Sequence, residues 1–145
     1  MRAVVQRVKS ASVTSEGALV GSIEAGLCVL LGVTHTDTAA QSAKMASKLW
    51  HLRIFDDADG VMNVSLAQTS GAILLVSQFT LYGDTSGGRR PSWIDAARPE
   101  VAEPLVEETV RELMKLGATV ETGRFRTNME VSLVNDGPVT VIVET

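Results

Sequence analysis

Ala72-Ile73-Leu74-Leu75-Val76, followed directly by Ser77-Gln78-Phe79-Thr80, predicts a buried strand that ends in polar chemistry. The first five residues form the most apolar run of the chain, with the length and β-branched content of a central strand, so we expect a strand over 72–79. Its polar end would bring hydroxyls, a carboxamide and free backbone N–H groups to the edge of the core. Residues 83–91 then add glycines, small hydroxyls and two arginines, which is typical of a mobile loop. A rigid strand that opens into such a loop often carries a functional site.

A second polar stretch, Asn135-Asp136-Gly137-Pro138-Val139-Thr140, lies between two strand-like runs near the C-terminus. Its composition predicts a turn at 136–138, and a Gly-Pro bond can be cis there. We expect the two polar stretches to form the site together.

Size and composition predict one domain over 1–145 with a core of its own. The chain is 45% hydrophobic and 21% charged, which is ordinary for a soluble globular protein. Its longest apolar run is far short of the ~20 residues that cross a bilayer, and its first residues alternate rather than form the apolar core of a signal peptide. The single cysteine, Cys28, lies among leucines and valines, which indicates a buried thiol and no internal disulfide. We therefore expect a cytoplasmic protein that does not span a membrane.

The net charge of −4 alone argues against a nucleic-acid-binding protein. The charges are unevenly distributed, however. Acidic residues gather at 56–59 and 100–112, whereas Arg89, Arg90, Arg124 and Arg126 lie near the two polar stretches. A local basic patch on an acidic protein therefore stays open.

Periodicity and turn residues predict an α+β domain with two helices and a mixed or antiparallel, barrel-like sheet. The first helix is expected from Asp37, as N-cap, to Leu52, and the second from Pro99 to Leu116, closed by Gly117. Pro104 should kink the second helix or delay its start. We expect strands at 1–9, 18–23, 27–33, 54–55, 61–64, 72–79, 119–122, 129–134 and 139–144. This order suggests two related halves, each of three strands around one helix.

The acidic segment 56–60 and the two histidines do not predict a metal site or a catalytic triad. Residues 56–60 lack the spacing and terminal glutamate of a calcium loop and are interpreted as a hairpin turn. His35 and His51 are expected to be core or surface residues, and neither forms a zinc-ligand pair with Cys28. We therefore expect no metal and no cofactor. The glycine-rich loop has no Walker motif, although Arg89 and Arg90 could contact phosphate.

No general base accompanies Thr80, which makes this residue a weak candidate for a covalent nucleophile. The alternative is that the backbone N–H groups of Phe79 and Thr80, freed where the strand ends, stabilise an oxyanion. Both interpretations remain open on the residues alone.

Three segments resemble the D-aminoacyl-tRNA deacylase family: Ser77 to Gly83, Arg90-Pro91-Ser92, and Met129 to Thr140. The N-terminal residues 1–8 and Gly26-Leu27 fit as well, so the resemblance covers essentially the whole chain. It implies that family's fold and a homodimer that hydrolyses the ester between a D-amino acid, or glycine, and the terminal adenosine of tRNA.

The resemblance also implies roles for individual residues. Gly137 and Pro138 would form a cis-peptide loop that enters the partner's active site, where their carbonyls leave no room for an L side chain. Arg7 would brace this loop, and Met129 would lie near the adenosine. The pocket would be lined by Ser77, Gln78, Phe79 and Thr80. Catalysis in the family is thought to use the tRNA's own ribose hydroxyl, a positioned water and main-chain N–H groups.

The chain departs from the family at two places. Arg126-Thr127 stands where Gly-Ala is usual, close to Met129, so it is expected to affect how the adenosine is held. Trp93 replaces the usual phenylalanine after Arg-Pro-Ser. Two rival hypotheses predict different behaviour. A non-catalytic module would bind RNA ends without turnover. An esterase for small D-amino-acid esters would not need Arg89 and Arg90.

Overall fold

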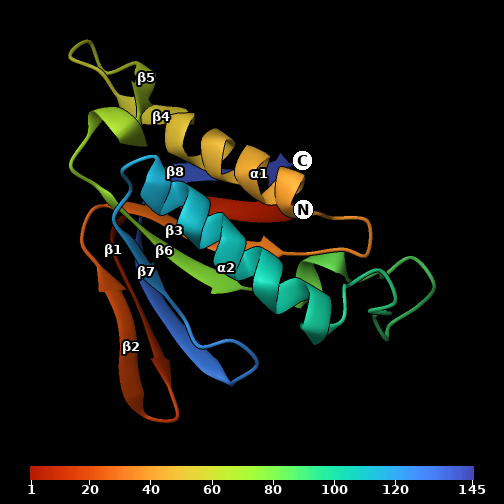
Figure 1. Cartoon of the computed structure of the whole chain (residues 1–145). Helices are drawn as coiled ribbons and strands as arrows, with labels where there is room; N and C mark the ends of the chain where they lie inside the picture. The colour runs from red at the N-terminus through yellow and green to blue at the C-terminus, as the bar shows by residue number, and fades with distance from the viewer.

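The computed structural model describes all 145 residues, as eight strands, two α-helices and two 3₁₀ turns (Figure 1). No helix in it is long and apolar enough to cross a membrane. In chain order the elements are β1 (Arg2–Ser15), β2 (Ala18–Ile23), β3 (Gly26–Gly32), α1 (Ala39–His51), β4 (Arg53–Asp56), β5 (Met62–Ser65), η1 (Leu66–Gln68), β6 (Ala72–Ser77), η2 (Phe79–Tyr82), α2 (Pro99–Lys115), β7 (Val120–Thr122) and β8 (Met129–Glu144).

Six strands form one mixed sheet in the order β2-β1-β3-β6-β7, with β8 along the other edge of β1. The β3–β6 and β6–β7 pairs are parallel, and the other pairs are antiparallel. The fourteen-residue β1 pairs with β3 through its first half and with β2 through its second, while β8 follows it along nearly its whole length. Long bent strands of this kind curl a sheet on itself. The predicted α+β, barrel-like architecture with two helices is confirmed.

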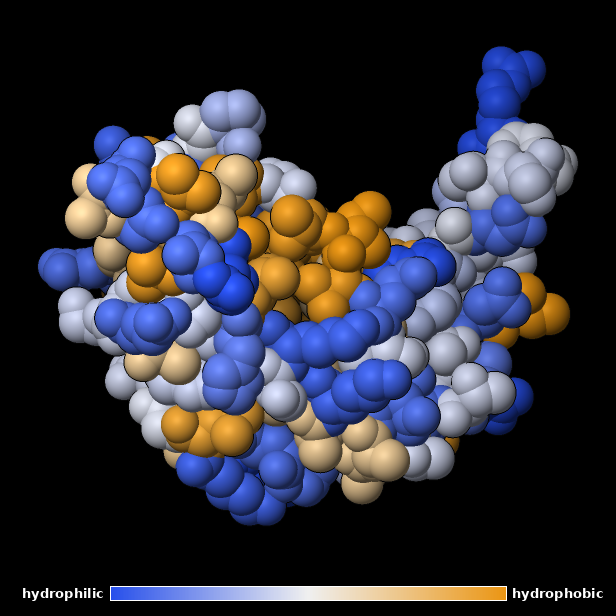
Figure 2. All heavy atoms as spheres, turned by 90° about the horizontal axis from the view of Figure 1, so that it is seen from above, coloured by the Kyte–Doolittle hydropathy of each residue, from blue (hydrophilic) through white to orange (hydrophobic).

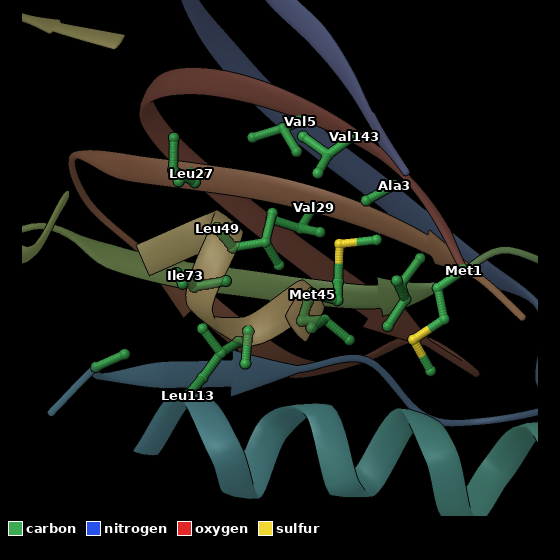
Figure 3. Packing of buried hydrophobic residues seen from close by; sticks show 14 of the residues in the cluster. Met1, Ala3, Val5, Leu27, Val29, Met45, Leu49, Ile73, Leu113 and Val143 are labelled. Atoms are coloured by element: carbon green, nitrogen blue, oxygen red, sulfur yellow. The ribbon is translucent and has the colours of Figure 1, made fainter. Parts of the chain in front are cut away.

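Both helices contribute side chains to the larger of two hydrophobic clusters (Figure 3). Met45 and Leu49 of α1 lie against Val5 and Val29 of the sheet, and Leu113 of α2 closes the same cluster. These five side chains are essentially inaccessible to solvent. Removal of their apolar surface from water stabilises the fold.

The second cluster contains Val8, Val13, Cys28, Leu74 and Val76. Its members in β3 and β6 alternate with those of the first cluster, so it lies on the other face of these strands. Burial raises the pKa of the Cys28 thiol to about 11, because a thiolate would lose its hydration there. The expectation of a buried, unpaired cysteine is therefore confirmed.

Four sequence-based expectations for the strands are wrong. The first strand continues to Ser15 rather than ending at residue 9, because its second half pairs with β2 and β8. The central strand ends at Ser77 rather than Phe79, because the chain turns into η2. Residues 129–134 and 139–144 form one continuous strand, β8, because both parts pair with β1. The expected two equivalent halves are absent, since β4 and β5 form a separate two-stranded sheet. The hairpin turn at 56–60 is confirmed, with the Asp57 carboxylate accepting from the N–H groups of Asp59 and Val61.

The N-cap of α1 differs from the predicted one. Thr38, not Asp37, caps α1, and its hydroxyl accepts from the Ala40 N–H. The Asp37 carboxylate instead accepts from the Met1 amino group at 2.5 Å and from the Thr34 N–H at 2.8 Å. Only the tertiary fold brings that amino group alongside.

Helix α2 begins at Pro99 and ends before Gly117, as predicted. Gly117 adopts a φ of 100°, the left-handed conformation that terminates helices. Pro104 lies inside the helix and does not delay its start. Leu116, just beyond the last helical residue, is 40% exposed, whereas Ala102 in the first turn is buried.

Candidate functional site

A largely apolar cavity of about 620 Å³ opens where β6 ends, between the start of α2 and the segment that leads into β8. Twelve of its eighteen lining residues are hydrophobic, so bound ligand atoms would be shielded from water on several sides. The cavity is lined by Leu31, Val33, Val76, Ser77, Gln78, Phe79, Trp93, Ala96, Ala97, Pro99, Ala102, Val106, Phe125, Arg126, Thr127, Asn128, Met129 and Val131.

The polar end of β6 forms one wall, through Ser77, Gln78 and Phe79. The last ladder bond runs from the Gln78 N–H to the Leu31 carbonyl, at 2.8 Å, and η2 begins at the next residue. The first N–H groups of a helix have no acceptor within it, and no side chain caps η2. The N–H groups of Phe79 and Thr80 are therefore unsatisfied by their own helix, at the edge of the cavity.

Thr80, also expected to line the pocket, does not line it. A 3₁₀ turn rotates each successive residue by about 120°, so Thr80 leaves the face that Phe79 occupies. Its hydroxyl is exposed and accepts a hydrogen bond from the Gln78 amide at 2.5 Å. No histidine or carboxylate lines the cavity to serve as its base.

Three aromatic residues line the cavity, Phe79, Trp93 and Phe125, and the sequence-based site included only Phe79. Phe79 and Trp93 are 55% and 42% exposed, and their ring centroids lie 5.5 Å apart in an edge-to-face arrangement. Gly83 makes room for the Trp93 ring, because a Cβ there would collide with it. Trp93 had stood out only as a departure from the family pattern. The signal for Trp93 that the sequence offered was a single aromatic residue directly after a polar, glycine-rich loop.

The loop at residues 83–91 is closed by hydrogen bonds at its base, and its tip is exposed. Asp84 and Ser92 exchange two backbone hydrogen bonds, each 2.8 Å. The Asp84 carboxylate accepts from the Ser86 N–H, which lowers its pKa. Arg89 and Arg90 are exposed at the tip and do not line the cavity.

Met129, the first residue of β8, opposes Ser15 of β1 and lines the cavity. Its sulfur fills the space beside Gly123, where a Cβ would come within 2.6 Å of it. The structure thus places Met129 on the same cavity as Ser77, Gln78 and Phe79.

The Gly137-Pro138 segment is an irregular part of β8 rather than the predicted turn. The pairing of β8 with β1 shifts register between Gln6 and Val8, opposite this segment, and again between Val8 and Ser10, and the Gly137–Pro138 bond is cis. Both residues are exposed, and neither lines the cavity. A single chain therefore does not bring the two polar stretches together, because β8 carries this segment along β1 instead.

Arg7 contacts this segment through Asp136, the residue before Gly137. Its buried side chain donates to the Asp136 carbonyl at 3.1 Å and to the Ile54 carbonyl at 2.7 Å. It also pairs with the carboxylates of Asp136, at 3.1 Å, and Asp56, at 3.2 Å. Arg7 thereby links Asp136 to Ile54 and Asp56 of β4.

The histidines lie outside the cavity. His35 Nε2 contacts the Ile94 carbonyl at 2.7 Å, and His51 Nδ1 contacts the Ser47 carbonyl at 2.9 Å. No group of three or more histidine, cysteine, aspartate or glutamate side chains is placed to hold a metal ion.

The fold and the cavity together define a class of α+β protein: a nearly closed mixed sheet with two helices, and a pocket where the central parallel pair ends. Residues 4–144 match the family model described as D-Tyr-tRNA(Tyr) deacylase. The chain belongs to this family. Its enzyme class is that of the D-aminoacyl-tRNA deacylases, hydrolases that act on the ester bond of aminoacyl-tRNA.

Curated relatives with the name D-aminoacyl-tRNA deacylase are similar over the full chain. The Halalkalibacterium halodurans protein is 54% identical over 144 residues, and that of Desulfatibacillum aliphaticivorans is 57% identical over 144; each alignment covers 99% of both chains. The Streptomyces coelicolor protein is 56% identical over 145 residues, again with 99% of both chains covered.

Two solved structures have the same fold. One, described as c-Myc DNA Unwinding Element Binding Protein, is 38% identical with a TM-score of 0.93, over 100% of this chain and 99% of that one. The other, a probable eukaryotic D-amino acid tRNA deacylase, has a TM-score of 0.84 at 16% identity, covering 99% and 98%. At that identity the second likeness concerns the fold alone.

Proposed function

We propose that this enzyme removes D-amino acids and glycine from tRNA in the cytoplasm and spares L-aminoacyl-tRNA, and that it does so as a homodimer. The observation that carries the proposal is the family match over residues 4–144, joined to a cavity that contains the polar strand end. In this proposal the Gly137-Pro138 segment of one protomer completes the cavity of its partner.

The exposure of Gly137 and Pro138 away from their own cavity supports an action in trans. No strand pairs with the outer edge of β8, and Val134 and Ile142 of that strand are 54% and 68% exposed. Apolar side chains also gather in a hollow on the face seen in Figure 2. A free strand edge with exposed apolar residues favours association with a second copy.

The chirality filter would be steric. Backbone carbonyls of Gly137 and Pro138 would face the α-carbon of the amino acid and exclude a side chain in the L position. Glycine has no side chain and would pass the same filter. Arg7 would position the filter through its bonds to Asp136.

The chemical step would need little from side chains. The N–H groups of Phe79 and Thr80 would hold the ester carbonyl oxygen as charge develops on it, while a water, assisted by the ribose hydroxyl of the tRNA, attacks the carbonyl carbon. The ester C–O bond would then break, releasing the amino acid and the tRNA with its terminal ribose hydroxyl restored. Ser77 and Gln78 would shape the pocket, and Met129 would lie near the terminal adenosine. The absence of a histidine or carboxylate from the cavity lining is consistent with this division of work.

The test is deacylation of matched D-tyrosyl-, L-tyrosyl- and glycyl-tRNA at low enzyme concentration. We expect release from the D-tyrosyl and glycyl substrates with the L-tyrosyl form spared. Tight tRNA binding without release would favour a non-catalytic RNA-binding module. Hydrolysis of D-tyrosine methyl ester at the same efficiency, undiminished by Arg89→Gln and Arg90→Gln, would favour a small-ester esterase.

Backbone catalysis predicts that Thr80→Ala keeps kcat/KM within about tenfold of wild type, because the N–H group remains. Phe79→Pro should lower it by about 10²–10³-fold, since proline lacks the N–H yet is tolerated at the first position of a helix. Phe79→Ala is the matched control, which removes the ring and keeps the N–H. Single-turnover rates on D-tyrosyl-tRNA measure all three. Complete loss in a folded Thr80→Ala variant would instead identify Thr80 as a nucleophile.

A further inference from the structure

We propose that Arg126 holds the phosphate on the 5′ side of the terminal adenosine, so that it positions the tRNA end in the cavity. This inference rests on the proposed function. Arg126 is the only charged residue among the eighteen that line the cavity, in a chain whose net charge is −4. The one formal charge facing a bound ligand is therefore positive.

The guanidinium of Arg126 has no partner within the chain: it enters no ion pair and donates no hydrogen bond. The neighbouring Arg124 differs, because it pairs with Glu16 at 3.3 Å and does not line the cavity. An exposed, unpaired guanidinium at a cavity wall retains its full capacity for two parallel hydrogen bonds to an oxyanion.

The backbone that carries Arg126 is fixed by its neighbours. The Gly123 N–H donates to the Leu75 carbonyl at 3.2 Å, and the Thr127 hydroxyl donates to the Arg124 carbonyl at 3.0 Å. The Ser15 hydroxyl donates in turn to Thr127, at 2.8 Å. Arg126 itself has a φ of 60°, a left-handed conformation in which glycine would be less strained. The segment therefore presents a cation at a position that backbone energetics alone would assign to glycine.

The other side chains of the cavity fit the remainder of a nucleotide. The exposed rings of Phe79 and Trp93 offer faces on which an unpaired base can stack. A guanidinium recognises phosphate and the rings recognise a base, so the lining matches an adenosine with a phosphate attached better than an adenosine alone. The ester would then lie at the Ser77–Phe79 wall.

The direct test compares binding of adenosine 5′-monophosphate and adenosine by NMR titration. Wild type should prefer the monophosphate by about tenfold, as expected for one charge-assisted contact, and Arg126→Gln should abolish that preference. Arg126→Lys should keep part of it, because charge remains while the paired geometry is lost. Arg124→Gln is the matched control two residues away and should keep all of it.

Kinetics give a second readout. For D-tyrosyl-tRNA, Arg126→Gln should raise KM by about tenfold with kcat unchanged, and should flatten the salt dependence of binding by about 0.7 in the log–log slope. For D-tyrosyl-adenosine, which has no phosphate, the same substitution should have no effect. Arg126→Gly should show the same loss with an unchanged or higher melting temperature, which separates binding from structural damage.

Equal preference for the monophosphate in wild type and Arg126→Gln would overturn the proposal, as would an equal loss in Arg124→Gln, which would indicate a diffuse electrostatic field. The proposed function fails differently. If wild type does not deacylate D-tyrosyl-tRNA while the Arg126-dependent preference persists, the phosphate contact stands and the deacylation of D-tyrosyl-tRNA does not.

Discussion

Gly137→Ala is expected to lower kcat/KM for D-tyrosyl-tRNA by about 10²-fold while the protein stays folded, because displacement of positioning groups by about 1 Å has effects of this size. A Cβ at Gly137 would collide with the Asn135 amide and come within 2.9 Å of the Val139 backbone nitrogen. The added methyl must therefore move the backbone that presents the Gly137 carbonyl. Single-turnover deacylation and the melting temperature, measured together, test both halves of the expectation.

The double variant Gly137→Ala, Asn135→Ala is the internal control. It removes the nearest colliding group and leaves only the Val139 contact, so part of the lost turnover should return. Asn135→Ala alone reports the effect of the missing amide, which accepts a hydrogen bond from Gln6. Normal turnover in Gly137→Ala would mean that this segment lies outside the site.

Mixing two impaired variants tests whether the segment acts in trans. A dimer of Gly137→Ala with Phe79→Pro would carry one site with both defects and one site with neither. After subunit exchange, half of the dimers should be mixed, which predicts recovery of about one quarter of wild-type activity. No recovery, with mixed dimers detected by mass spectrometry, would contradict an arrangement in which one protomer's segment serves the other's cavity.

Gly26→Ala is expected to have the largest effect on stability, lowering the free energy of unfolding by about 4 kcal/mol or more. Gly26 opens β3 between Val8 of β1 and Ala72 of β6. A Cβ there would overlap the Ala72 carbonyl oxygen and lie 2.7 Å from the Ala72 nitrogen. The collision is with backbone on a strand that pairs in parallel, so no side-chain rotation can relieve it. Urea denaturation of the folded fraction, together with the soluble yield, measures the loss.

Gly60→Ala is the matched control, since it adds the same methyl group in the β4–β5 hairpin turn. Gly60 has a φ of 76°, and no neighbouring atom lies within 4 Å of the position that a Cβ would take. It should therefore lose only about 1 kcal/mol, the usual difference between glycine and alanine in a left-handed conformation. An equal loss in both variants would show that the close approach of β1, β3 and β6 does not limit stability.

Local chemistry in the sequence was sufficient for several features of the fold. Pro99 and Gly117 marked the ends of α2, since proline is favoured at a helix start and glycine just beyond an end. The aspartates at 56–59 marked the hairpin turn by the same kind of reasoning. The apolar run before Ser77 also indicated a central strand with polar residues at its end. Each of these signals depends on residues within a few positions of one another.

Pairing with distant residues decided what the sequence left unresolved. The sequence suggested two strands and a turn over 129–144. Because β1 is long enough to pair with both parts, residues 129–144 form a single strand. Asp37 had the composition of a helix cap, yet the Met1 amino group, brought near by the fold, takes its carboxylate and leaves the cap to Thr38.

The residues of the cavity were likewise only partly predictable from the sequence. The apolar run 72–76 and the polar residues after it were enough to predict a central strand with a polar end, because such runs and breaks are properties of neighbouring residues, although the strand ends two residues earlier than expected. Only the tertiary structure placed Trp93, Arg126 and Met129 around that strand end, and kept Gly137 and Pro138 away from it in the single chain. The physical reason is that strand register and chain crossing act between residues far apart in the sequence, and no local pattern records them.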